Sequence, residues 1–535
     1  MGSASIGACG DDSGESLFDG GAGDAQVQDE NRLGDGYAAD AHQGSFGDFP
    51  ANPIVDSPDG APAAPPNSST LFGPLDAGAS AGGPCLVEPE VGSLYPNNWL
   101  RPRFHWVAAN GENLFELRVH APNQQNDLVV YTPGTYWTMP KSMWDGLRTH
   151  SSDLPLTVSV RGGVYASNTL SSLALGSMGP LGIAPVDAPG SIVYWTTSGG
   201  SSLKGFTIGD ESVGTELVPN QVQQFSTNCI GCHTSTPDGL FVGLSTVNGW
   251  NDAIASIEQG KTGQTPPFLG AAGKAALEHA PRGILSFSAA HWQNGDHVAV
   301  TTVDDVTIGW VDLEATSGAA AGDLTRTGDP RGAGTPTWSH DGNTIVYVST
   351  DAITTGRLSV GPADLYSVPY ANKQGGAATP VMGASDPNFN EYYPVYAPDD
   401  QWLAFDRIGN GMDMYNQPAA EVNVIPASGG TPTRLAANDP PACSGKKSPG
   451  VTNSWPKWAP SVGKTNDGRA FYWIVFSSTR DASGRPQLFI SPVMVDKQNK
   501  VTTYAALYLW NQPAGENNHT PAWDTFKIPP TPPPN

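Results

Sequence analysis

A hairpin segment recurs five times from residue 233 of this 535-residue chain onward, and it restricts the possible folds more than any other feature. The copies join a short strand, usually carrying Trp or Tyr, to a turn and then to an apolar strand. The turn is often Asp-Gly, which tolerates the backbone angles of a tight hairpin. Further strands follow most copies, so the repeat predicts an all-β array of similar antiparallel sheets. The five segments read HTSTPDGLFVGLST, AAHWQNGDHVAVTT, PTWSHDGNTIVYVS, PVYAPDDQWLAFDR and PKWAPSVGKTNDGRAFYWIVFSS.

The repeat resembles that of TolB-type β-propellers, whose units read P-x-W-S-P-D-G, over residues 190–528. The chain enters this region with the strands GSIVYWTTSG and SLKGFTIG, and it leaves with the lone inner strand HTPAWDTF. Joined, these strands make one blade, so the resemblance implies six blades closed by the last strand. Closure leaves no exposed sheet edge. The Pro-rich tail, residues 529–535, cannot join a sheet and should be extended.

Two different segments precede the repeats. Residues 85–178 contain alternating strands at spacings of about ten residues, a pattern that resembles immunoglobulin or fibronectin type III domains and predicts a small β-sandwich. Residues 1–84 are rich in Asp, Gly, Ala, Ser and Pro and poor in large apolar side chains. We therefore expect a disordered acidic leader there.

The charge of the chain excludes some partners. Half of the net charge of −24 falls within residues 1–84, which argues against binding nucleic acid or anionic lipid. The sequence SIGAC resembles the end of a bacterial lipobox, which implies an acylated Cys9 and a place in the periplasm or at the cell surface. Membrane contact would then occur only through this anchor. The alternative is an unpaired cysteine in the leader.

The run Cys229-Ile230-Gly231-Cys232-His233 spells the attachment motif of a c-type haem. Its two thiols would form thioethers with one covalent haem c, and His233 would be the proximal iron ligand. The alternatives are a disulfide between the two cysteines or half of a zinc site. No second Cys-x-x-Cys or His-x₃-His lies nearby to complete a zinc site.

The repeat alignment also predicts where the haem lies. His233 takes the position of a proline in other repeats, at the start of an inner strand, so the haem should cap the central channel. The sequence leaves several candidates for the second iron ligand. His519 comes first, because its place in the repeat puts it on the same face; it could instead be a loop residue that hydrogen-bonds backbone. The other candidates are Met412 and Met414, His279 or His291, and last Met382, and an empty position is the remaining alternative.

These features predict an exported mono-haem c-type cytochrome that transfers electrons to or from redox or envelope proteins. One alternative is a haem enzyme whose open iron acts on peroxide or on small nitrogen or oxygen species. Another is a protein-binding propeller with a structural haem or none. Cys85 and Cys443 are the remaining thiols, and a disulfide between them would join sandwich and propeller.

Overall fold

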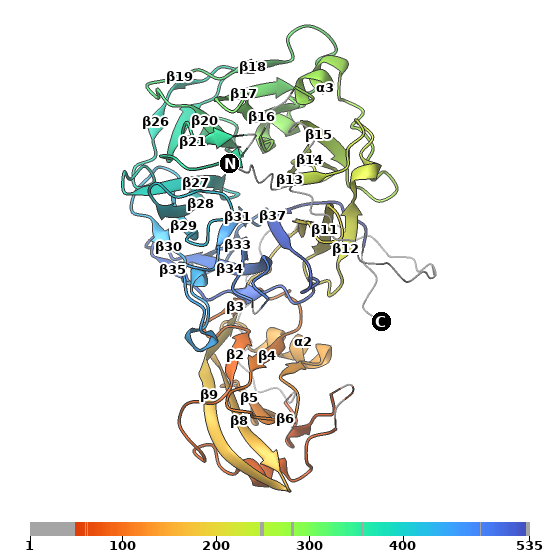
Figure 1. Ribbon diagram of the computed structural model, residues 1–535, viewed down its shortest axis with the longest axis vertical. Coiled ribbons are helices and arrows are strands. Elements are labelled where there is room, and N and C mark those ends of the chain that lie inside the picture. The colour runs from red at the N-terminus through yellow and green to blue at the C-terminus, as the bar shows by residue number, and fades with distance from the viewer. Residues whose placement is uncertain are drawn as a thin grey trace, which may run out of the picture.

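The computed structural model describes residues 49–530, apart from residues 59, 61, 247–250, 280–282, 355–356 and 482. Its regular secondary structure is mostly β-strand with few short helices, as the sequence predicts. Figure 1 shows a smaller N-terminal part below a larger body of sheets. In this described part, no helix is both long and apolar enough to cross a membrane. Cys9 and the last residues of the predicted tail, 531–535, lie outside it.

Two sheets form the N-terminal part and share one hydrophobic core. Their strand orders are β1-β6-β5-β8-β9-β3 and β2-β4-β7. The buried rings of Trp106 and Phe115, one from each sheet, lie 5.5 Å apart between centroids. The elements are β1 (Ile54–Val55), α1 (Ser68–Phe72), β2 (Cys85–Glu88), β3 (Leu94–Tyr95), β4 (Arg103–Val107), β5 (Leu114–His120), β6 (Leu128–Thr132), β7 (Tyr136–Thr138), α2 (Lys141–His150), β8 (Leu156–Ala166) and β9 (Thr169–Ile183).

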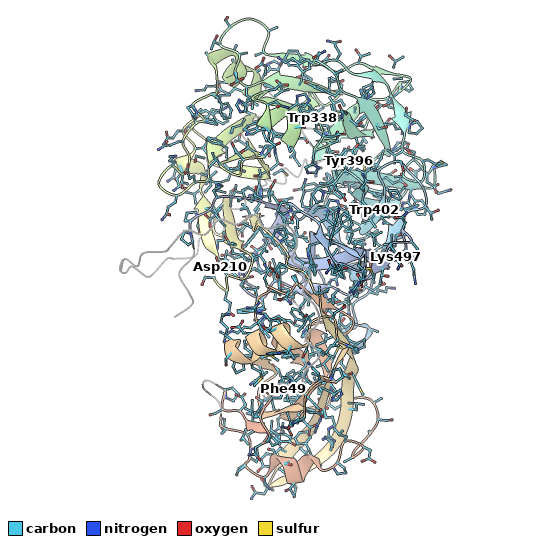
Figure 2. All side chains as sticks on the ribbon, turned by 180° about the vertical axis from the view of Figure 1, so that it is seen from behind. Phe49, Asp210, Trp338, Tyr396, Trp402 and Lys497 are labelled. Carbon is cyan, nitrogen blue, oxygen red and sulfur yellow. A yellow bond between two sulfur atoms is a disulfide. The ribbon has the colours of Figure 1, made fainter. Side chains whose placement is uncertain are left out.

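Residues 49–84 are folded around these sheets, apart from the two undescribed positions, so the predicted disorder through residue 84 is wrong for this stretch. Strand β1 pairs in parallel with β6, and helix α1 ends in Phe72, which is fully buried. Phe49 belongs to the main core and lies within the N-terminal part in Figure 2. Residues 1–48 lie outside the described residues.

A buried ion pair explains why a segment with few apolar residues packs here. Alternation along β5 predicts that Glu116 faces solvent, yet its carboxylate lies 2.7 Å from the Arg161 guanidinium and both side chains are buried. Arg161 also donates to the Pro74 carbonyl at 2.8 Å and lies 5.5 Å from the ring centre of Phe72. Buried charges require such partners. The segment therefore folds because it supplies acceptors and an aromatic cover.

Six antiparallel sheets follow one another along residues 191–524. Their strand orders are β37-β10-β11-β12, β13-β14-β15, β16-β17-β18, β20-β21-β24-β26, β27-β28-β29-β30 and β31-β33-β34-β35. The bounds are β10 (Ser191–Thr196), β11 (Ser202–Thr207), β12 (Gly214–Leu217), β13 (Ile230–Ser235), β14 (Phe241–Thr246), β15 (Asp252–Ser256), β16 (Val298–Val303), β17 (Thr307–Asp312), β18 (Ala321–Asp323), β20 (Ala333–Trp338), β21 (Thr344–Ser349), β24 (Asp364–Pro369), β26 (Thr379–Pro380), β27 (Phe389–Tyr396), β28 (Trp402–Gly409), β29 (Glu421–Pro426), β30 (Thr433–Arg434), β31 (Ser454–Trp458), β33 (Ala470–Ser478), β34 (Gln487–Val495), β35 (Val501–Thr503) and β37 (Asn518–Asp524).

Short elements occupy the connections between these strands. The strand pairs are β19 (Arg326–Thr327) with β25 (Gly376–Ala377), β22 (Ile353–Thr354) with β23 (Arg357–Leu358), β32 (Gly463–Lys464) with β33, and β36 (Leu507–Tyr508) with β34. The helices are α3 (Ala271–Leu277) and α4 (Ala289–Gln293), with 3₁₀ turns at Pro219–Gln221, Ala436–Asn438 and Ala442–Ser444.

The inner sides of the six sheets surround one central cavity of about 320 Å³. Its lining comes from β13, β20, β27, β31 and β37, and from residues 284–289 before β16. Strand β37 pairs antiparallel with β10, from Ser191 opposite Asp524 to Thr196 opposite Asn518, so the last strand completes the first sheet. Sheets that radiate from a shared channel are the pattern of a β-propeller.

The Asp-Gly turns form the hairpins through the same local contacts in different repeats. Asp238 and Asp341 each accept a hydrogen bond at 3.0 Å from the backbone N–H two residues further on. Gly239 and Gly342, which follow them, have φ values of +72° and +79°. Such angles favour glycine and close the turn without strain.

The third sheet departs from the predicted repeat. Its segment AAHWQNGDHVAVTT contains helix α4 where the other repeats have an inner strand. On the inner side of β16, Ser286 forms an isolated bridge opposite Val300. Trp292 anchors the helix, because its ring packs edge-on against Phe287 and its Nε1 donates to Asp238 at 2.9 Å. The aromatic side chain that was predicted to belong to a strand therefore belongs to a helical turn.

Two linkages fasten the N-terminal part to the six sheets. Cys85, at the start of β2, is disulfide-bonded to Cys443 in the insertion before β31, which is the bridge considered from sequence. Arg480, after β33, forms an ion pair with Glu90, after β2, with Nη1 and Oε1 2.9 Å apart. Both charged side chains are only 4% exposed.

Candidate cofactor site in strand β13

Most of the Cys-x-x-Cys-His motif lies within an inner strand, whereas the repeat predicts a place at the entry to that strand. Cys229 directly precedes β13, and the rest of the motif belongs to the strand. The pairing of β13 with β14 is interrupted between Ile230 and His233, where Gly231 and Cys232 form a bulge. In the chain Cys232 precedes His233 as Tyr393 precedes Pro394 in a later repeat.

The two cysteines have different environments. Cys229 is 1% exposed, its N–H and C=O both bond the Thr227 hydroxyl, and it takes part in a disulfide. Cys232 has a free thiol and is partly buried. Burial raises the pKa of the Cys232 thiol to about 11, so the thiol is protonated at neutral pH and a weak nucleophile.

His233 points away from Cys232, into the contact with the first sheet. The side chain is 3% exposed, and its Nε2 lies 3.1 Å from the Val193 carbonyl in β10. Its Nδ1 is buried and has no hydrogen-bond partner in the described structure. Burial lowers the pKa of His233 to about 4, so the imidazole is neutral at neutral pH, the form that binds metals.

His519, the leading candidate for the second ligand, is the one candidate that the structure brings to His233. It lies in β37 opposite Trp195, and the two rings meet edge-on at 4.6 Å. Burial, and next the electrostatic effect of His233, lower the pKa of His519 to about 4. Its Nδ1 is likewise buried without a partner among the described residues. Two neutral imidazoles thus lie close together, each with one unused nitrogen.

Two cysteines and two neutral histidines are the residue types that hold a c-type haem. In the conformation of strand β13, however, their side chains do not all point to one place. Cys232 and His233 are neighbours in a strand, so their side chains leave opposite faces. Cys229 is engaged in its disulfide. Attachment to both thiols with His233 beneath the iron therefore requires residues 229–233 to leave this conformation.

The remaining ligand candidates lie elsewhere. Met414 is fully buried in the core between the fourth and fifth sheets, and Met412 is 42% exposed. His291 is held by Asp296 at 2.6 Å and packs on Trp338, and the His279 side chain is 66% exposed near Asp304. Met382 is 69% exposed. No described contact connects any of these five side chains with His233.

The sequence reasoning missed an aromatic cluster beside the motif. Trp455 lies 5.5 Å from His519, 6.0 Å from Tyr393 and 6.1 Å from Tyr415, measured between ring centres. Burial, and next the nearby Cys232, raise the pKa of both Tyr393 and Tyr415. Tyr393 and Trp455 each precede the repeat proline, and that shared position was the available signal.

A zinc site finds no support in this geometry. Across the described ranges, no three His, Cys, Asp or Glu side chains are grouped as a metal ion would require.

Comparison with known proteins yields similarity of structure alone. No protein-family profile and no curated protein sequence matches the chain. A putative TolB from Agrobacterium tumefaciens is 15% identical with a TM-score of 0.32, over 62% of this chain and 98% of that one. Hydrazine synthase from Kuenenia stuttgartiensis is 14% identical with a TM-score of 0.31, over 58% and 90%. A dihydro-haem d1 dehydrogenase is 11% identical with a TM-score of 0.27, over 79% and 78%.

Proposed function

We propose that this protein is an exported c-type cytochrome that carries single electrons. The observation that supports this most is the Cys-x-x-Cys-His motif on an inner strand, with His519 beside His233. Both imidazoles are buried and neutral, and each keeps a nitrogen without a partner in the described structure. Two neutral imidazoles are the ligand set of a six-coordinate electron carrier.

Four residues would hold the haem. Cys229 and Cys232 would anchor it through thioethers, and His233 and His519 would bind the iron. When bound, the haem supplies a metal centre that accepts and releases one electron. The surrounding apolar side chains, including Trp195 and Trp455, would exclude water from the iron.

Two local changes must precede attachment. The disulfide of Cys229 must be reduced, and His233 must release the Val193 carbonyl. The bulge at Gly231 and Cys232 lowers the cost, because the regular pairing with β14 is already interrupted there. The motif therefore lies at the part of β13 that can detach most easily.

A protein-binding propeller without haem is the second candidate, and the disulfide of Cys229 is the observation that favours it. An absorption spectrum of the protein produced with a c-type haem maturation system separates the two. A low-spin spectrum that cyanide and carbon monoxide leave unchanged supports the carrier. A high-spin spectrum that shifts with these ligands indicates a haem enzyme instead. The absence of any haem band indicates a protein-binding propeller without haem.

The His519→Ala variant tests the second ligand. We expect a complete change from a low-spin to a high-spin spectrum, together with carbon monoxide binding, because no other candidate nitrogen or sulfur contacts His233 in the described structure. The matched control is His291→Ala, which removes a histidine that bonds Asp296. An unchanged spectrum in His519→Ala would show that the assignment is wrong.

The proposal extends to architecture and location. We propose that the six sheets form a closed six-bladed propeller of the TolB type and that the two N-terminal sheets form an immunoglobulin-like sandwich. The pairing of β37 with β10 supports closure. We place the protein in the periplasm or at the cell surface of a bacterium, with redox or envelope proteins as partners. A tether through an acylated Cys9 would require a free thiol at that residue.

A further inference from the structure

One lysine lines the central cavity at a repeat position where the other inner strands have neutral side chains. In five inner strands, the residue after the repeat proline, or after His233, lines the cavity. Four of these residues are small or neutral, and the fifth is Lys457 in β31. The set is Thr234, Thr337, Val395, Lys457 and Ala522. One repeat thus departs from the others by placing a charge inside the channel.

Lys457 has no counter-ion among the residues that the structure describes. It takes part in no ion pair or side-chain hydrogen bond among the described residues, although it is partly buried. Burial lowers the pKa of Lys457, and the nearby Cys232 and Asp524 offset part of that effect. An unpaired ammonium in a partly buried site is costly, and such a group in a cavity is a candidate ligand-binding residue.

Asp524 does not neutralise the lysine directly. Its carboxylate lies beyond ion-pair distance of Lys457 and accepts a hydrogen bond from the Thr525 N–H at 2.7 Å. His340, which also belongs to the lining, is paired with Asp400 at 2.7 Å. The Lys457 ammonium is therefore the cation available to an incoming anion, and the Asp524 carboxylate in the same lining opposes that binding.

The rest of the lining suits a flat apolar body. The stacked rings of Tyr393 and Trp455 line the cavity, together with Trp338 and Tyr396, which Figure 2 places within the body of sheets. Thr335 adds a buried hydroxyl without a hydrogen-bond partner in the described structure. A volume of about 320 Å³ is at the lower end of the range of small-molecule sites.

We propose that this cavity binds a small organic anion, a carboxylate on a planar apolar body, with Lys457 as its counter-ion. Aromatic walls supply apolar contact, and the ammonium supplies a charge-assisted hydrogen bond. This inference uses none of the proposed haem ligands. Trp455 belongs to both sites and Cys232 lies near Lys457, so binding is tested on protein produced without haem.

The test uses benzoate and benzamide as probes, titrated into the full-length protein by calorimetry and by tryptophan fluorescence. Benzoate should bind, and benzamide should bind about tenfold more weakly or worse, because it lacks the charge. Lys457→Met should lose benzoate binding, and Lys457→Arg should retain most of it. Lys497→Met, which removes an exposed lysine labelled in Figure 2, should change nothing.

Further measurements separate this proposal from its alternatives. Lys457→Met should melt at the wild-type temperature or above, because it removes an unpaired charge, so lost binding would not reflect misfolding. Asp524→Asn should bind benzoate equally or more tightly, because it removes a repelling carboxylate. Weaker binding in Asp524→Asn, no benzoate binding by the wild type, or wild-type affinity in Lys457→Met would each overturn the proposal.

Discussion

Ending the chain at Pro513, which removes strand β37, is expected to abolish the cooperative unfolding transition of the protein. The strand is the inner strand of the first sheet, and β10 has no other partner on that side. Without it β10 becomes the unpaired inner edge of the first sheet.

The free energy lost with β37 should exceed the free energy of unfolding of the protein. Trp523 of β37 is 4% exposed, packs against Trp99 of the N-terminal part at 6.4 Å, and donates to the Pro189 carbonyl at 2.8 Å. Removing one such tryptophan typically costs about 3–5 kcal/mol. Because domains are stable by only about 5–15 kcal/mol, losing the whole strand should leave no folded state.

Circular dichroism during heating measures this prediction. The matched control ends at Pro530, keeps β37 whole, and should melt as the full chain does. A chain ending at Pro513 that still unfolds in one sharp transition near the wild-type temperature would contradict closure through β37.

The second large effect is expected from Arg480→Met. The variant leaves the Glu90 carboxyl buried without its cation, and breaking such a pair from one side costs about 3–5 kcal/mol. Arg480 also donates to the side chain of Asn453 at 2.7 Å, so this acceptor loses its donor as well. Urea unfolding should show a lower free energy of unfolding, and Arg485→Met, which removes an exposed arginine, should show no change.

The destabilisation by Arg480→Met should depend on pH, and the pKa of Glu90 gives the direction of that dependence. Burial raises the pKa of Glu90 to about 7 in the folded protein, above its ordinary value of 4.5. The folded state therefore holds this proton more tightly than the unfolded state, and the contribution of Glu90 to stability falls as pH rises from about 4.5 to 7. Arg480→Met should raise this pKa further and be more damaging at pH 8 than at pH 5. Equal damage at both values would contradict this role of Glu90.

The sequence predicted the sheets and their hairpins because that information is local. Asp238 and Gly239 contain the whole chemistry of a turn, and the same pair recurs at Asp341 and Gly342. The same alignment associated the motif with an inner strand, but it predicted the entry to the strand, whereas residues 230–233 belong to β13 itself. The helix at Trp292 escaped prediction because its environment, not its spacing, decides its conformation.

The features that were not predicted depend on contacts between residues far apart in the chain. Alternation in β5 could not show that Glu116 meets Arg161 45 positions away, or that residues 64–74 cover that pair. The side to which His233 points depends on the bulge between β13 and β14, which the motif does not encode. The neighbourhood of His233 and His519 could be predicted, because both follow from the repeat.

The central claim is that a haem is attached at residues 229–233, and mass spectrometry of the tryptic peptide 205–261 tests it most directly. The protein is produced with a c-type haem maturation system, and the matched variant is Cys229→Ser with Cys232→Ser. We predict that the wild-type peptide carries the added mass of one haem and that the variant peptide carries none. A wild-type peptide without haem, with Cys229 still in its disulfide and Cys232 a free thiol, would contradict the claim.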